Sequence, residues 1–184
     1  ECVCAERRNK ALAYRFAKDR ALSLGVELLL NLAHRREAPK LPSPDRFQHG
    51  EFGKPYFEGE GAPAFCLSHS GEYAVCAIGG EEVGVDIEET GMADAGVARR
   101  CFTRRELLRV MPDGEHVDAE EFCRLWTLKE SFIKQIGTGL SLDPLRFEIL
   151  GGEPIGVSQD YDAQNYQCRL YEALPGYKIA LCLS

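Results

Sequence analysis

Three acidic side chains occur at positions where they can meet and bind a cation. Asp86 and Glu88 lie two residues apart at the end of the apolar segment 83–89, so both point to one face of a strand. Glu130 lies in the segment 122–136, whose apolar residues recur at helical spacing, on a stripe separate from the apolar one. If the strand end abuts this stripe, two carboxylates about 4 Å apart repel by roughly 4 kcal/mol at an effective dielectric of about 20. Such a cluster requires a cation.

The chemistry of these carboxylates indicates which cation they would bind. Oxygen ligands select a hard ion, and a site with few carboxylates suits Mg²⁺, which keeps water ligands and takes up substrate phosphates. Lys134 follows Glu130 by one helical turn and could hold a phosphate oxygen as a point charge. A purely structural interpretation stays open. An Asp-x-Glu sequence after a strand is usually a solvated strand end, and Glu130 with Lys134 could be a surface pair worth a few tenths of a kcal/mol.

Length and composition narrow the possible classes of protein. A chain of 184 residues is long enough for one core, and a net charge of -7 argues against broad nucleic-acid binding. No apolar run approaches the roughly 20 residues of a membrane span, and no signal peptide opens the sequence, so we expect a cytoplasmic protein. The eight cysteines lie mostly in apolar contexts and are expected to be buried thiols. Cys66 and His69 have the spacing of half a zinc site, but no second pair follows.

Apolar patterns predict two successive runs of helices followed by strands. The first run has helical sequence over residues 5–34, interrupted near Gly25, and then strands that form an antiparallel meander. The second run has a helix capped by Thr103 and a longer helix that is capped by Asp118 and ends at Gly137. The expected loop is 38–44, and the expected strands are 64–67, 73–78, 83–87, 145–150, 155–157, 166–171 and 177–183.

Two motifs carry a resemblance to a known family. Residues 84–88 (Gly-Val-Asp-Ile-Glu) and 126–134 (Trp-Thr-Leu-Lys-Glu-Ser-Phe-Ile-Lys) resemble the signature motifs of the Sfp-type 4'-phosphopantetheinyl transferases. The resemblance extends to residues 53–56 (Gly-Lys-Pro-Tyr), 65–70 (Phe-Cys-Leu-Ser-His-Ser) and 137–141 (Gly-Thr-Gly-Leu-Ser). These motifs occur in the order that the family shows.

The resemblance implies an α+β fold. Family members are pseudo-dimers of two similar halves, each a helix packed on a small antiparallel sheet, with the active site in the cleft between them. Residues 1–82 would form the N-terminal half, with coenzyme A nucleotide contacts, and residues 83–184 the C-terminal half, with the metal site and the catalytic helix. A short sequence similarity between residues 71–77 and 176–181 agrees with two related halves.

The resemblance also implies a reaction. The family transfers the 4'-phosphopantetheine arm of coenzyme A to a conserved serine of an apo acyl or peptidyl carrier protein and releases adenosine 3',5'-bisphosphate. It implies that Asp86, Glu88 and Glu130 hold Mg²⁺ here. Glu130 would also be the base that takes the serine proton, directly or through water. Lys134 would bind the pyrophosphate, because phosphoryl transfer depends on neutralised charge and a positioned nucleophile.

Several cations should converge on coenzyme A. The contacts that the resemblance implies are Lys54 near the nucleotide, Ser68 and His69 near its phosphates, and Arg7 and Lys10 near the 3'-phosphate. His69 has an alternative as a hydrogen-bonded turn residue, and the basic helix face that carries Arg7 can simply be solvated. Family members commonly carry an arginine shortly before the glycine at position 25, and Arg20 is the nearest counterpart, shifted by one residue. The role of Arg20 stays open.

A basic surface on the transferase would attract the carrier protein. Carrier proteins of this class are acidic around their modified serine, so a basic and partly apolar surface would draw them in. Residues 99–105 (Arg-Arg-Cys-Phe-Thr-Arg-Arg) are the densest basic run in an otherwise acidic chain, although a solvated helix start explains them equally well. Similarity to the Sfp type further implies a monomer with broad carrier use and a role in secondary metabolism.

Two other functions remain to be distinguished. One is a non-catalytic module that binds coenzyme A or a nucleotide without turnover, and the other is a Mg²⁺-dependent phosphohydrolase in which water replaces the carrier serine. The presence of Lys134 and all three carboxylates weighs against loss of turnover. No Ser-His-Asp signature, Cys-His signature or Walker loop supports another class of enzyme.

Overall fold

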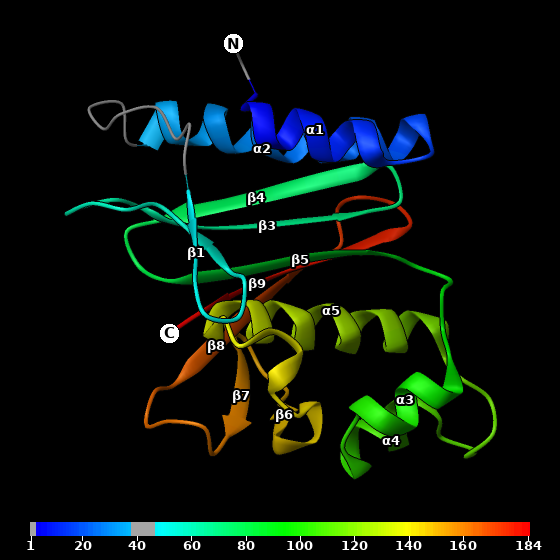
Figure 1. The fold of residues 1–184 in the computed structure, drawn as a ribbon. Helices are drawn as coiled ribbons and strands as arrows, with labels where there is room; N and C mark the ends of the chain where they lie inside the picture. Colours follow the sequence, from blue (N-terminus) through cyan, green and yellow to red (C-terminus); the bar gives the residue numbers. More distant parts are fainter. Residues whose placement is uncertain (1–2, 38–46) are drawn as a thin grey trace.

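The structure is a computed structural model that describes residues 3–37 and 47–184. Helices on one side and a long helix on the other enclose antiparallel strands between them (Figure 1). The elements are α1 (Ala5–Ala13), α2 (Ala17–Glu37), β1 (Gln48–His49), β2 (Pro55–Tyr56), β3 (Ala64–Ser70), β4 (Tyr73–Gly79), β5 (Val83–Glu89), α3 (Ala95–Cys101), α4 (Arg104–Val110), α5 (Ala119–Ile136), the 3-10 turns Gly139–Ser141 and Pro144–Arg146, β6 (Phe147–Ile149), β7 (Ile155–Gln159), β8 (Tyr166–Tyr171) and β9 (Tyr177–Leu183).

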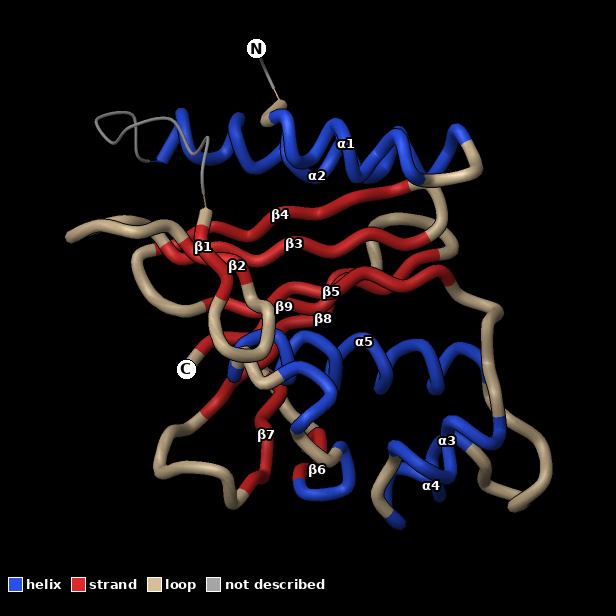
Figure 2. Tube along the Cα trace, in the orientation of Figure 1, coloured by secondary structure: helices blue, strands red, loops and turns tan. Residues whose placement is uncertain are grey.

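Two halves follow one another along the chain. In the first, α1 packs on α2, and α2 covers the β3–β4 hairpin. In the second, α5 packs on a five-stranded antiparallel sheet of order β5-β9-β8-β7-β6. Strands β4, β3, β5 and β9 lie in succession between α2 and α5 (Figure 2). The predicted α+β class is confirmed, whereas the assignment of coenzyme A contacts to 1–82 and of the metal site to 83–184 stays a prediction.

The predicted meander is wrong at its third strand. β4 pairs with β3, but β5 pairs with β9 over its whole length, from Val83 opposite Leu183 to Glu89 opposite Tyr177. A short connection between two strands permits a hairpin without requiring one, because each strand has two edges. Here one edge of β5 takes the C-terminal strand, and its other edge lies beside β3.

The helix break is also displaced from the predicted position. Residues 14–16 separate α1 from α2, and Tyr14 adopts an extended conformation there. Gly25 lies inside α2, where a glycine costs about 1 kcal/mol relative to alanine yet does not end a helix supported by packing. The predicted loop at 38–44 lies outside the described residues. No helix in the described ranges has the length and apolar character that a membrane span requires.

Local capping signals place α4 and α5 correctly, whereas α3, which is capped by Asp94, was not predicted. Thr103 and Glu106 form the complete capping box of α4. Asp118 accepts hydrogen bonds from two backbone N–H groups at the start of α5, and Gly137 ends this helix in the left-handed region at φ 78°. The boundaries of α5 therefore follow from residues within one turn of each end.

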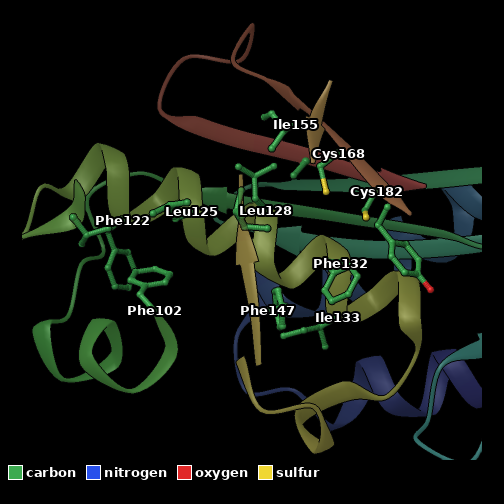
Figure 3. Packing of buried hydrophobic residues seen from close by; sticks show 14 of the residues in the cluster. Phe102, Phe122, Leu125, Leu128, Phe132, Ile133, Phe147, Ile155, Cys168 and Cys182 are labelled. Carbon is green, nitrogen blue, oxygen red and sulfur yellow. The ribbon is translucent and has the colours of Figure 1, made fainter. Parts of the chain in front are cut away.

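The main core lies between α5 and the five-stranded sheet. Figure 3 shows Leu125, Leu128 and Phe132 of α5 facing strand residues such as Cys168 and Cys182. Beside them, the ammonium of Lys129 lies 3.0 Å from a carboxylate oxygen of Glu106, and both side chains are only 1% exposed. Lys129 also donates to backbone carbonyls of Pro144 and Phe147. This buried ion pair fixes α4 and β6 to the helix residue that precedes Glu130.

Gly84 is required by the close approach of β5 to α5. A Cβ atom added at Gly84 would overlap the carbonyl oxygen of Ser131 and the backbone nitrogen of Gln135. We expect Gly84→Ala to lower the free energy of unfolding by about 3 kcal/mol, because backbone cannot yield as a flexible side chain does. Thermal denaturation should show a melting temperature lower by roughly 6–12 °C. Gly80→Ala is the control, since its Cβ would meet no atom within 4 Å. Equal melting temperatures for the two variants would contradict this packing argument.

Candidate active site

The candidate site lies where β3, β5 and α5 come together. The packing of α5 against Gly84 fixes which face of β5 this helix covers, and the side chains of Asp86 and Glu88 belong to the same face by strand alternation. Glu130 and Lys134 belong to α5 and lie one turn apart. The structure thus brings the acidic strand end and the acidic helix stripe to one location.

Asp86 is the most deeply buried of the three acids, at 2% exposure. Its Oδ1 atom accepts hydrogen bonds from Ser68 Oγ at 2.7 Å and from Lys134 Nζ at 2.6 Å. Its Oδ2 atom is buried and has no hydrogen-bond partner in the described part of the chain. Burial raises the pKa of Asp86 against the attraction of Lys134. Burial alone would lower the pKa of Lys134, but Asp86 outweighs this and raises it.

Glu88 is held from two directions. Ser70 Oγ of β3 donates to one carboxylate oxygen at 3.0 Å, and Trp126 Nε1 of α5 donates to the other at 3.2 Å. Burial raises the pKa of Glu88, and the charge of Asp86 raises it further, while the two hydrogen bonds oppose this shift. Glu88 therefore has a fixed orientation and an unfavourable charge.

Glu130 lies close enough to Asp86 and Glu88 for their charges to affect its pKa. Burial raises the pKa of Glu130, and the negative charges of Asp86 and Glu88 raise it further, against the attraction of Lys134. Within residues 3–37 and 47–184, however, no three His, Cys, Asp or Glu side chains are already gathered closely enough to hold a metal ion. The ammonium of Lys134 lies against Asp86 instead. A metal site made of all three acids therefore stays a prediction.

The residues nevertheless fit a divalent cation chemically. Burial raises the pKa of all three carboxylates, and the charge of Asp86 raises the pKa of Glu88 and of Glu130 further. The single ammonium of Lys134 neutralises only part of their charge. The buried Oδ2 of Asp86 offers a free acceptor beside them. Oxygen donors of this kind suit Mg²⁺, which needs only one or two carboxylates from the protein.

A group of positive charges lies next to the acids. Desolvation lowers the pKa of His69, and the positive charges of Lys134, Arg7 and Lys10 lower it further, against the negative charge of Asp19. Arg7 is partly neutralised because its Nε donates to Glu27 at 3.2 Å. The remaining positive charge favours binding of an anion beside His69.

A pocket of about 210 Å³ adjoins Lys134. Its walls are mostly apolar and come from the loop before β2, from β3 and from the C-terminal end of α5. The lining residues are Phe52, Gly53, Lys54, Pro55, Phe65, Cys66, Leu67, Ile133, Lys134, Gly137 and Gly139. An apolar pocket beside a cluster of cations can take a ligand with one apolar end and one anionic end.

Comparison with known proteins identifies the family. The model of the 4'-phosphopantetheinyl transferase superfamily matches residues 82–182. The 4'-phosphopantetheinyl transferase Sfp of Bacillus subtilis (strain 168) is 31% identical over 182 residues, which cover 98% of this chain and 81% of the relative. The chain belongs to the Sfp-type 4'-phosphopantetheinyl transferases. Its class of enzyme, a 4'-phosphopantetheinyl transferase, follows from this membership.

Further relatives of this transferase agree. The 4'-phosphopantetheinyl transferase gsp of Aneurinibacillus migulanus is 30% identical over 185 residues, covering 98% of this chain and 76% of the relative. Among solved structures, Thermotoga maritima holo-acyl-carrier-protein synthase (AcpS) aligns with a TM-score of 0.45 and 22% identity, covering 55% of this chain and 61% of that chain. A likeness that distant carries no argument about the site.

Lys54, which the motif placed near the nucleotide, is engaged by groups of the protein itself in this transferase. Its Nζ atom lies 2.6 Å from Glu82 and 3.2 Å from the backbone carbonyls of Val83 and Gln135. Lys54 thus caps the C-terminal end of α5, while its side chain lines the apolar pocket. A nucleotide contact through this ammonium stays a prediction, and it would have to share Lys54 with Glu82.

The structure also shows where Arg20, Cys66 and His69 lie. Arg20 Nε donates to the backbone carbonyl of Tyr14 at 2.8 Å, so its guanidinium holds the turn between α1 and α2. Cys66 is buried and donates to the carbonyl of Val85, whereas His69 is exposed. Cys66 and His69 are three positions apart in β3, an odd spacing that puts them on opposite faces of the strand. The two side chains therefore do not form half a metal site.

Two side chains at the site received no role from the sequence. Ser70 and Trp126 both lie within the recognised motifs, yet neither is charged nor a usual metal ligand. The available signal was strand alternation, because Ser68 and Ser70 have the same spacing in β3 as Asp86 and Glu88 have in β5.

Proposed function

We propose that this transferase moves the 4'-phosphopantetheine group from coenzyme A to a conserved serine of an apo acyl or peptidyl carrier protein, with Mg²⁺, and releases adenosine 3',5'-bisphosphate. The observation that carries the proposal is the buried carboxylate of Asp86, which pairs with the ammonium of Lys134 through one oxygen and leaves its other oxygen without a hydrogen-bond partner in the described residues. The named relatives support the transferred group. We further propose a monomeric cytoplasmic enzyme that serves carriers of secondary metabolism.

The proposed chemistry assigns one task to each charged group. The carrier serine oxygen attacks the phosphorus that bears the pantetheine arm, and the bond from this phosphorus to the bridging oxygen breaks. Glu130 takes the serine proton, and its raised pKa makes the carboxylate a stronger base than an ordinary glutamate. Mg²⁺, when bound by Asp86, Glu88 and Glu130, would neutralise charge on the diphosphate. Lys134 would leave Asp86 and bind a diphosphate oxygen.

The neighbouring cations complete the proposed binding of coenzyme A. Arg7 and Lys10 are assigned the positive charge for the 3'-phosphate, and Ser68 and His69 the hydrogen bonds to the other phosphates, because the lowered pKa of His69 favours its neutral ring. The apolar pocket beside Lys54 is large enough for part of the nucleotide. Each of these contacts was implied by the motifs, and each remains to be tested by substitution.

A mass-spectrometric assay tests the proposal. The protein is incubated with coenzyme A, Mg²⁺ and a panel of apo carrier proteins, and the carriers are then weighed. Gain of one phosphopantetheine arm, lost again when the carrier serine is replaced by alanine, supports the transferase. Cleavage of coenzyme A without any carrier would instead identify a phosphohydrolase. Tight binding of coenzyme A with neither product would identify a non-catalytic module.

The basic run of α3 and α4 provides a test of carrier docking. Arg104 and Arg105 are exposed at the start of α4, and Leu108 on the same helix is 64% exposed, so the surface is both basic and apolar. The pair of Arg105 with Glu148 lies at the surface and offsets little of this charge. We expect Arg104→Glu with Arg105→Glu to raise the KM for carrier about tenfold, the equivalent of ~1.4 kcal/mol.

The KM for coenzyme A should stay unchanged in the same variant, because α4 contributes nothing to the pocket. Arg35→Glu with Arg36→Glu is a matched control, since it reverses two exposed charges at the end of α2. Carrier kinetics that change equally in both variants would indicate a general charge effect. Unchanged kinetics in the α4 variant would remove this surface from carrier docking.

A further inference from the structure

Two serines of β3 join the two halves of the fold at the candidate site. Ser68 Oγ donates to Asp86 at 2.7 Å, and Ser70 Oγ donates to Glu88 at 3.0 Å. β3 and β5 belong to different sheets, so no ladder of backbone hydrogen bonds connects them. These two side-chain contacts, each spanning 18 residues of sequence, therefore align the end of β5 with the end of β3.

Ser70 differs from Ser68 in its surroundings. Ser68 also receives a hydrogen bond from Lys134, so it belongs to the group that would meet the diphosphate. Ser70 instead accepts a hydrogen bond from the backbone nitrogen of Glu89 at 3.1 Å while it donates to Glu88. One hydroxyl thus fixes both the backbone and the carboxylate at the end of β5.

Glu88 is left with one usable lone pair on each oxygen. A carboxylate oxygen has two acceptor sites, and each oxygen of Glu88 uses one for Ser70 or for Trp126. The carboxylate cannot rotate without breaking a bond to the first half or a bond to α5. Loss of a hydrogen bond that orients a metal ligand in this way typically lowers metal affinity by about 10–100-fold.

We infer that Ser70 is a positioning residue that orients Glu88 as a metal ligand, so that the first half of the fold contributes to a site whose acids all come from the second. This inference rests on the proposed function, because it requires that Glu88 binds the divalent cation. Ser70 is uncharged and would act on the cation only through Glu88. The contact from Trp126 provides the second point of support.

Binding of Mn²⁺ by the full chain tests the inference. The free ion is followed by electron paramagnetic resonance, with and without coenzyme A, so that the result does not depend on turnover. Ser70→Ala should weaken Mn²⁺ binding about tenfold. Ser70→Thr keeps the hydroxyl and should bind as the unmodified protein does. Ser158→Ala, at an exposed position on β7, is the control and should change nothing.

A double-mutant cycle separates positioning from a general structural effect. If Ser70 acts through Glu88, Ser70→Ala should have no further effect on Mn²⁺ affinity in a Glu88→Gln protein. A structural role alone would lower the affinity equally in both backgrounds and would overturn the inference. Equal affinities for the unmodified protein and Ser70→Ala would overturn it as well, while leaving the proposed metal site intact. Absence of Mn²⁺ binding by the unmodified protein would overturn both.

Discussion

Replacement of Glu130 by glutamine is expected to lower the transfer rate by at least about 100-fold, because a neutral amide cannot accept the serine proton. The same change should stabilise the ligand-free protein. Asp86, Glu88 and Glu130 are each buried enough to raise their own pKa, and Glu130 is repelled by the other two charges. Glutamine removes the charge at position 130. A gain of about 1 kcal/mol would raise the melting temperature by roughly 2–4 °C.

The stabilisation by glutamine should depend on pH in a defined direction. The pKa of Glu130 is raised in the folded state above its ordinary value of 4.5. Above the raised pKa, the folded protein carries the unfavourable charge. The Glu130→Gln protein then exceeds the unmodified protein most in its free energy of unfolding. As the pH falls through the raised pKa, Glu130 becomes protonated in the folded state. The difference is then lost progressively and disappears below about 4.5.

Transfer and stability should be measured together for this variant. Melting temperatures at pH 8 and at pH 5, without metal and without coenzyme A, give the stability difference and its sign. The exposed Glu60→Gln is the control and should change neither the melting temperature nor the transfer rate. Full-speed transfer by the Glu130→Gln protein would exclude Glu130 as the base.

The parts of this structure that could be predicted are those set by neighbouring residues. Asp118 and Gly137 determine the ends of α5 within one turn, and alternation in β5 puts Asp86 and Glu88 on one face. The partner of β5 depends instead on a strand almost 100 residues later, for which the sequence carries no local signal. The break at Tyr14 is held by Arg20, which donates to the Tyr14 carbonyl, and neither residue is a usual helix-ending signal. Gly25 is such a signal, but it lies within α2.

At the candidate site, too, the identities of the residues could be predicted but their contacts with distant parts of the chain could not. Resemblance indicated which residues to consider, but not which side chains they contact in the fold. The ammonium of Lys54 is engaged by Glu82 and by the end of α5, and that of Lys134 by Asp86. A motif records residues that meet a ligand at some stage. Their contacts within the protein depend on the nearest opposite charge, and only the assembled fold determines which charge that is.

Replacement of Lys134 by methionine should have the second large effect. It removes the cation proposed to bind the diphosphate, so transfer should fall by at least about 100-fold. It also leaves the buried carboxylate of Asp86 without its ion-pair partner. Loss of one partner from a fully buried pair costs about 3–5 kcal/mol, and the 29% exposure of the Lys134 side chain reduces this to about 2–3 kcal/mol. The melting temperature should therefore fall by roughly 4–12 °C.

A second substitution separates the two roles of Lys134. Combining Asp86→Asn with Lys134→Met removes the uncompensated charge, so most of the lost melting temperature should return while transfer remains absent. The loss in the single variant should also shrink as the pH falls, because the pKa of Asp86, already raised by burial, rises further without Lys134 and the carboxyl becomes neutral. If Lys134→Met transferred within about tenfold of the normal rate, Lys134 would only neutralise Asp86, and the diphosphate would have to be bound by other cations.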